Sequence, residues 1–463
     1  YWIESLKSFL KFFQFLKSVF KKKHFMKNYN VFILLFITSF GFAQVNDSTQ
    51  VSYKKRVLES IEVDFLMSYY KQDGIHSAVA GGKGMEELTD ITPTIVVAVP
   101  LNDDDVLTVD MGISAYSSAS SGNINPFDSN TPSPWQASSG ASAQDVLTTL
   151  VINYSHSSDD RNTIWNAHVS GSVEYDYSSI GFGGGLTKLF NNKNTELGIA
   201  ANVYLDTWKP IYPKELQDFA DNGNNLNGGI FDNFTIIGNT SYAPTKFIFH
   251  QDKNRNSFAL SFSFSQVLNK KTQISIFADV LQQQGLLSTP YQRVYFADVD
   301  NAFINEFQLA DDIERLPDSR FKLPIGARLN YYVNEKLVLR TYYRFYTDNW
   351  GINSHTASLE LPYKITDRFT LIPMYRFYTQ QASKYFAPYE QHLSTEKYYT
   401  SDYDLSSFDA HQYGMGVSYT DIFTAAKIWK FGIKNLDFRY NHYSRSDGLE
   451  ADIVSFGIKF VMQ

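Results

Sequence analysis

The sequence of 463 residues contains no cysteine, and its 41 Lys and Arg residues are outnumbered by 48 Asp and Glu, which gives a net charge of −7. A chain without thiols has no disulfide, zinc–thiolate site or cysteine nucleophile. Such a chain is compatible with passage through an oxidising periplasm. With this acidic balance, no basic face emerges that would indicate a nucleic-acid partner.

Long apolar runs are also absent beyond Gln44, where no segment reaches the ~20 apolar residues that a membrane helix needs. Aromatic residues nevertheless make up 16% of the chain, while the mean hydropathy is slightly negative at −0.27. This combination is typical of a β-barrel, because its apolar side chains face lipid at every second position and its polar ones face the lumen.

The N-terminal region has the pattern of a secretion signal. A basic segment that ends at Lys27 precedes an apolar run over residues 31–37, and the small residues Gly41 and Ala43 precede Gln44. This order predicts a signal peptide over residues 26–43, followed by a mature chain over residues 44–463. Residues 1–25 are rich in Lys and Phe, and we interpret them as spurious upstream sequence in preference to a membrane-surface helix.

The mature chain repeats segments of about ten residues in which apolar and polar positions alternate, as in residues 258–265 and 337–346. Alternation of this length predicts membrane strands. We expect about sixteen of them, at residues 60–70, 92–101, 105–116, 146–155, 163–177, 180–190, 196–207, 257–268, 272–283, 321–333, 337–346, 355–365, 369–379, 410–420, 436–444 and 452–462.

The connections between these segments are of two kinds. Tight polar turns rich in Asn and Asp occur at residues 102–105, 191–194, 269–271, 334–336 and 366–368, whereas long loops occur at residues 118–144, 207–256, 286–320 and 382–408. If the first strand rises from the periplasm, every tight turn is periplasmic and every long loop is extracellular. A soluble sandwich does not have this parity. The sequence therefore predicts an all-β fold, an antiparallel transmembrane β-barrel in the bacterial outer membrane with lipid around it.

Charged residues of both signs occupy positions that alternation turns toward the lumen. They are Glu62, Asp64, Asp110, Glu174, Asp176, Arg340, Arg344, Glu360 and Arg376. In one interpretation they form opposed ladders that orient solutes in an aqueous channel. In the other they pair with one another and fill the lumen as structure. We favour the channel, because a barrel of about sixteen strands has a wide lumen.

The last strand resembles the signal that barrel-assembly machinery recognises. Gly457, Phe460 and Met462 carry the pattern: an inward glycine followed by lipid-facing apolar residues near the C-terminus. We therefore expect the assembly machinery as a partner.

A glycine-rich segment follows the first predicted strand, and its sequence is HSAVAGGKGMEEL over residues 76–88. Its His76, Gly81, Gly82, Gly84 and Glu86 resemble the signature of a Bacteroidetes family catalogued as domain of unknown function 3570. The resemblance continues through residues 89–127 and implies an outer-membrane barrel, but it supplies no activity. The spacing differs from that of a phosphate-binding loop, so we interpret the glycines as a sharp turn or a fold-back into the barrel mouth.

Three functions remain open. A channel for small solutes is the first, a non-conducting barrel that anchors or helps to assemble an envelope or surface complex is the second, and an outer-membrane hydrolase is the third. The histidines are dispersed without metalloprotease spacing, and no Ser/His/acid set is singled out. We therefore expect no enzyme activity, cofactor, catalytic residue or metal site.

Overall fold

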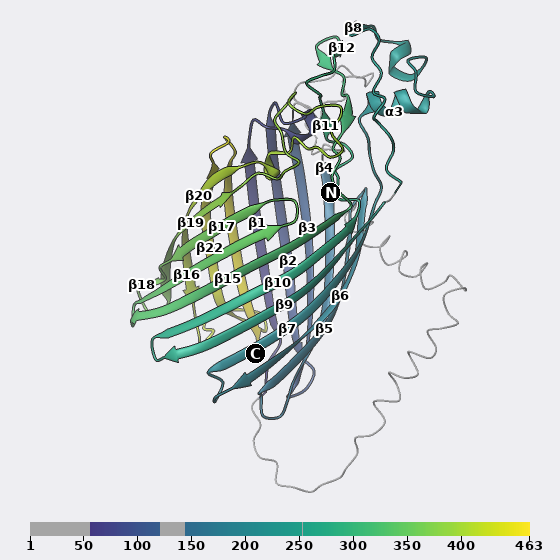
Figure 1. Cartoon of the computed structure of the whole chain (residues 1–463). Coiled ribbons are helices and arrows are strands. Elements are labelled where there is room, and N and C mark those ends of the chain that lie inside the picture. The colour runs from purple at the N-terminus through teal and green to yellow at the C-terminus, as the bar shows by residue number, and fades with distance from the viewer. Residues whose placement is uncertain (1–55, 121–143, 252) are drawn as a thin grey trace, which may run out of the picture. The chain divides into compact units, whose positions relative to one another are not determined.

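The alternating segments of the sequence form long strands that lie side by side in Figure 1, a view of the computed structural model. Described are residues 56–120, 144–251 and 253–463. The predicted signal peptide (26–43), the predicted upstream extension (1–25) and most of the 118–144 loop lie outside the described residues.

One antiparallel sheet contains all of these long strands. Its members are β1 (Glu62–Asp73), β2 (Glu86–Pro100), β3 (Asp105–Ser120), β4 (Gln144–Ser157), β5 (Thr163–Val173), β6 (Tyr177–Phe190), β7 (Thr195–Trp208), β9 (Asn254–Asn269), β10 (Thr272–Gly285), β15 (Ser319–Asn334), β16 (Leu337–Asp348), β17 (Asn353–Glu360), β18 (Tyr363–Lys364), β19 (Phe369–Gln380), β20 (Phe408–Thr420), β21 (Lys427–Ile428), β22 (Phe431–Arg445) and β23 (Glu450–Met462).

Closure comes from the pairing of the first and last strands. β1 pairs with β23 along its whole length, from Glu62 opposite Val461 to Asp73 opposite Glu450. β17 and β18 are one strand interrupted at Leu361 and Pro362, and β21 is a two-residue strand beside β22. The described residues thus form a closed antiparallel barrel of sixteen strands, as predicted.

The two faces of the barrel wall differ in polarity. Large apolar side chains such as Phe262 (43% exposed) and Ile199 (43%) point outward and lie open to the surroundings. Charged side chains of the other face reach one another over intervening strands: Arg439 on β22 pairs with Glu360 on β17 at 3.2 Å. Only the concave face of a closed sheet permits such contacts, so the charged face is the lumen and the apolar face is the one that suits lipid.

The connections divide the barrel into two ends. The turn end holds the tight connections 101–104, 158–162, 191–194, 270–271, 335–336 and 365–368, together with the longer segment 421–430 that includes β21. The loop end holds the described long loops 209–251, 286–318 and 381–407, and also the short connections 174–176, 349–352 and 446–449. The predicted parity of turns and loops is therefore correct. In the described ranges no helix is long and apolar enough to cross a membrane.

The loops at the loop end fold together into a body that we call the loop cap, defined as residues 74–85, 209–251, 286–318 and 381–407. It contains η1 (Ala78–Ala80), α3 (Lys214–Asp221), η3 (Gly229–Asp232), β8 (Ile236–Gly238), β11 (Arg293–Val294), β12 (Ala302–Ile304), β13 (Phe307–Gln308), β14 (Asp312–Ile313) and η4 (Tyr403–Leu405). In Figure 1, α3, β8, β11 and β12 gather beyond the same end of the strands.

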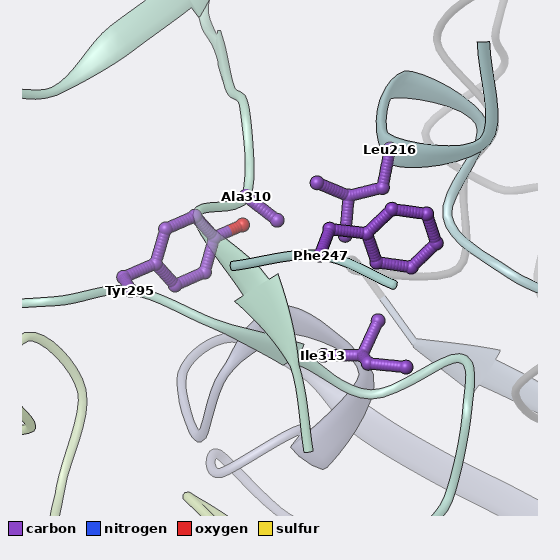
Figure 2. Close-up of a cluster of buried hydrophobic side chains, with 5 residues drawn as sticks. All are labelled: Leu216, Phe247, Tyr295, Ala310 and Ile313. Atoms are coloured by element: carbon purple, nitrogen blue, oxygen red, sulfur yellow. The ribbon is translucent and has the colours of Figure 1, made fainter. Parts of the chain in front are cut away.

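The loop cap has an apolar core of its own. Figure 2 shows Leu216 and Phe247 of the 209–251 loop gathered with Tyr295, Ala310 and Ile313 of the 286–318 loop, and each side chain is at most 4% exposed. Two further buried clusters belong to the cap as well, one around Ile304 and Leu309 and one around Val294 and Tyr399. The apolar core of the described chain therefore lies above the barrel rather than inside it.

Candidate functional site

Five arginines from four strands line one side of the lumen, and we call them the arginine wall: Arg328 on β15, Arg340 and Arg344 on β16, Arg376 on β19 and Arg439 on β22. Register brings them to one face, because Arg340 lies opposite Glu360 and Arg376 lies opposite Ser358. Alternation had predicted the inward direction of Arg340, Arg344, Arg376 and Glu360.

Glu360 is the one carboxylate that pairs with this wall among the described residues. It lies 3.7 Å from Arg340 and 3.2 Å from Arg439. Arg328, Arg344 and Arg376 have no carboxylate within ion-pair distance in the described part of the chain, and the Nε of Arg344 is buried without a hydrogen-bond acceptor. The wall thus carries more positive charge than its single acid neutralises.

A cavity of about 600 Å³ lies against this wall. Its lining includes Arg328, Arg340, Arg376, Glu360, Tyr342, Ser358, Asn330 and Met374. Most of these groups are hydrogen-bond donors or acceptors, so the cavity is built for a polar occupant.

The lumenal charges nearer the turn end behave differently. Glu62 pairs with Lys434 at 3.0 Å and with Lys459 at 3.2 Å, and Asp64 pairs with Lys459 at 3.2 Å. Glu62 and Asp64 were predicted to face the lumen, and they do. At this level the charges neutralise one another, which corresponds to the structural interpretation of the sequence pattern.

On the wall opposite the arginines, strand β6 turns glycines toward the lumen. On β6, a Cβ at Gly181 would lie 2.7 Å from the ring of Tyr204, and a Cβ at Gly183 would lie 2.2 Å from Asn202 Oδ1. The glycines of this strand therefore let side chains of neighbouring strands lie flat against it. Asp110, which the β2–β3 register turns inward opposite Val96, has no ion-pair partner among the described residues.

The loop cap crosses the lumen at the loop end. Strands β2, β3, β4, β5, β6, β7, β9 and β10 separate the loop after β1 from the loop after β10, so in a ring of sixteen strands these loops start on opposite sides. They nevertheless touch: Arg293 donates a hydrogen bond to the carbonyl of Val79 at 3.3 Å, and Lys83 donates one to Gln308 at 3.1 Å. Both loops therefore extend over the mouth and meet there.

A third side of the barrel joins the same junction through the loop between β19 and β20. Gln292 donates a hydrogen bond to Asp402 at 3.3 Å, and Thr400 donates one to Glu314 at 2.6 Å. His76 of the first loop stacks on Tyr403 with ring centroids 3.6 Å apart. Loops from three sides of the ring are thus tied together across the lumen.

The glycine-rich segment over residues 76–88, the signature segment, lies so close to the other loops at this junction that larger side chains would not fit. Gly81, Gly82 and Gly84 adopt φ values of +73°, +87° and +84°, which favour glycine strongly. A Cβ at Gly82 would lie 2.6 Å from the carbonyl oxygen of Ser401, and one at Gly81 would lie 2.7 Å from the ring of Tyr295. The segment folds back over the mouth, which corresponds to one of the two interpretations of its glycines, and Glu86 is the first residue of β2.

A buried ion pair anchors the cap. Glu215 at the start of α3 is fully buried and binds Arg293, with Oε1 at 2.7 Å from Nε and Oε2 at 3.3 Å from Nη2. Because Arg293 also reaches Val79, this pair links α3 to the signature segment.

Burial raises the pKa of several carboxyl groups at the junction and so favours their protonated, neutral form. Burial, with the negative charge of Asp402 as a second cause, raises the pKa of Glu314 to about 8. Burial likewise raises the pKa of Asp311 to about 7 and that of Asp402 to about 6. The cap therefore contains acids that titrate near neutral pH.

Two of the predicted lumenal acids occupy a different place. Glu174 and Asp176 were expected on a strand that runs to Tyr177, but β5 ends at Val173 and a hairpin closes between Glu174 and Tyr177. The hairpin forms there because Val173 already pairs with Ser178 of the next strand. Glu174 accepts a hydrogen bond from the Tyr116 hydroxyl, and burial raises its pKa to about 7.

Sequence reasoning missed Arg328, Arg439 and Lys434, although each lies in or beside a predicted strand. Arg328 between Ala327 and Leu329, and Arg439 between Phe438 and Tyr440, show the same alternation as the residues that were chosen. Alternation thus gave the inward direction of these side chains. Their pairing could not be read from it, because the charges that meet lie on strands far apart in sequence.

The terminal strand has the predicted geometry. Gly457 lies opposite Leu66 on the lumenal face, and Phe460 lies opposite Val63 on the outer face. Met462 on the outer face is 36% exposed. Throughout the described ranges, His, Asp and Glu side chains form no group of three or more that is arranged to hold a metal ion.

The comparison with protein families gives a direct result. The family described as "Protein of unknown function (DUF3570)" matches residues 37–449, which is most of the chain. The chain belongs to this family. The match agrees with the resemblance of the signature segment, and the closed barrel with its apolar outer face is that of an outer-membrane protein. A search of curated proteins finds no match.

Solved structures that are similar to this chain match it at low identity. A bacterial polysaccharide outer membrane secretin is 10% identical, with 88% of this chain and 100% of that chain covered and a TM-score of 0.42. A mutant of the TodX monoaromatic hydrocarbon channel is 9% identical (87% and 89% covered, TM-score 0.37), and a Pseudomonas aeruginosa FadL homologue is 10% identical (88% and 91% covered, TM-score 0.37). Similarity at this level says nothing about solutes.

Proposed function

We propose that this protein is an outer-membrane channel for small hydrophilic solutes. The observation that carries the proposal is the arginine wall, where one carboxylate, Glu360, pairs with two of the five arginines beside a cavity of about 600 Å³. A lumen that serves only as structure is expected to pair its charges, because an unpaired charge away from water is costly. The turn-end cluster around Lys459 is paired in that way, and the arginine wall is not.

The loop cap sets the size limit in this proposal. Segments that cross the mouth narrow the route, as the contact of Arg293 with Val79 illustrates. Solutes would pass beside these segments, so large molecules would be excluded. The contacts that tie the loops at the junction are largely polar, such as Gln292 with Asp402, and water can replace polar contacts when a loop moves.

The test is conduction by the purified full chain. In planar lipid bilayers it is expected to give discrete single-channel currents, and in liposomes it is expected to admit small sugars but exclude large ones. A correctly folded barrel that is silent in both assays would overturn the proposal.

A second candidate is a barrel that anchors a surface or envelope complex. The cap supports this function, because it is a folded body with its own apolar core (Figure 2) rather than a set of separate loops. A silent barrel with an intact cap in the conduction assay is the result that would favour this candidate. Under either function we propose that β23 is read by the barrel-assembly machinery during insertion.

A further inference from the structure

The arginine wall indicates what class of solute the lumen accepts. Its five arginines come from β15, β16, β19 and β22. On β5 and β6, on the opposite side, the face that contains Ser170 and Gly181 has no Asp, Glu, Lys or Arg. The positive charge is therefore concentrated on one side, and a solute in the cavity meets Arg328, Arg340 and Arg376 together.

The geometry of the guanidinium group narrows the choice. Its N–H donors form a rigid planar fork that matches the two oxygens of a carboxylate or phosphate. Glu360 pairs with one guanidinium nitrogen each of Arg340, at 3.7 Å, and Arg439, at 3.2 Å. Arg328 lies over the Tyr342 ring, with its guanidinium carbon 5.9 Å from the ring centroid. Donors on this wall are thus left for a ligand with acidic oxygens.

Neutral groups beside the arginines suit the rest of such a ligand. Tyr342, Ser358 and Asn330 line the same cavity and offer hydroxyl and amide groups, and its volume of about 600 Å³ lies in the range of small-molecule sites. Only one acid, Glu360, contributes to the lining. A cation would meet repulsion from three arginines there, so the cavity discriminates by charge as well as by size.

We propose that the cavity on the arginine wall binds small oxyanions, that is, solutes with a carboxylate or phosphate group, and that the channel is selective for anions. This inference rests on the proposed function as far as selectivity is concerned, but binding in the cavity does not require conduction.

The first experiment measures ion selectivity from the reversal potential of the full chain in a bilayer across a KCl gradient. The wild type is expected to prefer chloride over potassium several-fold. A triple variant, Arg328→Gln, Arg340→Gln and Arg376→Gln, is expected to lose this preference. The matched control, Lys270→Gln, Lys336→Gln and Arg368→Gln, removes the same charge from exposed turn-end positions and is expected to keep most of it.

The second experiment measures binding by calorimetry on detergent-solubilised protein, with malonate and inorganic phosphate as separate probes. Saturable binding of either probe by the wild type and the control triple, but not by the arginine triple, would support the proposal, and the preferred probe identifies the acidic group. Variants are compared only where the barrel keeps its folded mobility in gels without heating.

The outcomes separate the two claims. A silent barrel that still binds malonate or phosphate through the arginines overturns the channel and leaves the anion site standing. A wild type that conducts but prefers potassium overturns the anion site and leaves the channel standing. The same conclusion follows if the arginine triple variant keeps the chloride preference and binds the probes no more weakly than the wild type.

Discussion

The barrel and the loop cap are built on opposite rules, although one chain makes both. In the barrel, Phe262 and Leu260 lie 43% and 37% exposed on the outer face, while polar side chains line the interior. In the cap, Leu216 and Ile313 are fully buried, as in a soluble protein. The difference follows from the solvent, because lipid surrounds the barrel wall and water surrounds the cap.

The comparison shows where packing determines stability. The barrel gains order from a closed ladder of backbone hydrogen bonds, which leaves no sheet edge in an apolar solvent. The cap has only short strands, one short α-helix and three short 3-10 helices, so its stability comes from buried side chains and from the Glu215–Arg293 pair. Substitutions in the two regions should therefore have different consequences.

The largest effect is expected from breaking the buried pair. Glu215→Ala leaves Arg293 buried without its carboxylate, a change that costs about 3–5 kcal/mol in comparable cases. The cap should open while the barrel stays folded, because Glu215 contacts no barrel strand through this pair. Limited proteolysis should cleave residues 209–251 and 286–318 rapidly, with unchanged barrel mobility in unheated gels.

The matched control is Glu306→Ala, which removes an exposed carboxylate from the connection between β12 and β13 of the same cap. It should leave the proteolysis rate unchanged. Equal protection of Glu215→Ala and wild type would show that the pair does not hold the cap together.

A smaller effect is expected from removing apolar volume, and it should differ between the two regions. Leu216→Ala creates a cavity in the cap core and should cost about 2–5 kcal/mol of cap stability. Leu260→Ala on the outer face should cost less, because lipid chains fill the space that the side chain leaves. Denaturant titration measures the loss of stability in both variants. Protease sensitivity reports unfolding of the cap, and the mobility of unheated protein in gels reports unfolding of the barrel. Similar losses at the two sites would contradict the contrast.

The smallest effect is a pH dependence confined to the cap. Since burial raises the pKa of Asp311 to about 7 and that of Glu314 to about 8, ionisation of these groups is disfavoured in the folded cap. Cap stability is then highest below the unfolded carboxyl pKa of about 4 and falls as the pH rises toward 8.

Protection from protease should accordingly be greater at pH 5 than at pH 8.5. Asp311→Asn keeps an oxygen to accept the hydrogen bond from the Phe296 N–H, which is 2.8 Å long in the wild type. This variant should flatten the profile by raising protection at pH 8.5. A profile that rises with pH in the wild type would contradict the assignment.

The sequence predicted the barrel well because a membrane strand has a strict period of two. Arg340, Arg344 and Arg376 face the lumen as expected, since their direction depends only on local alternation. The partners of these charges are not local. Glu360 meets Arg439 across two intervening strands, and no pattern within either strand encodes that approach.

The cap could not be predicted for the same reason. Leu216, Tyr295 and Ile313 lie in stretches with many polar and turn-forming residues, where short elements leave no sustained period. Their burial depends on loops that leave the barrel at different points of the ring. Glu174 was assigned to a strand because alternation continues into a hairpin whose turn has no glycine or proline to mark it.

The pairing of β1 with β23 has a consequence for the order of biogenesis. Val79 and Arg293 are far apart in sequence and leave the wall on opposite sides, as do the partners Lys83 and Gln308. These contacts become short only when the sheet has curled into a ring, because in an open sheet the same loops point away from each other. Cap formation is therefore a late event that reports closure of the seam. Once formed, the cap ties loops from opposite sides of the ring to each other. These loop contacts must therefore break before β1 and β23 can separate.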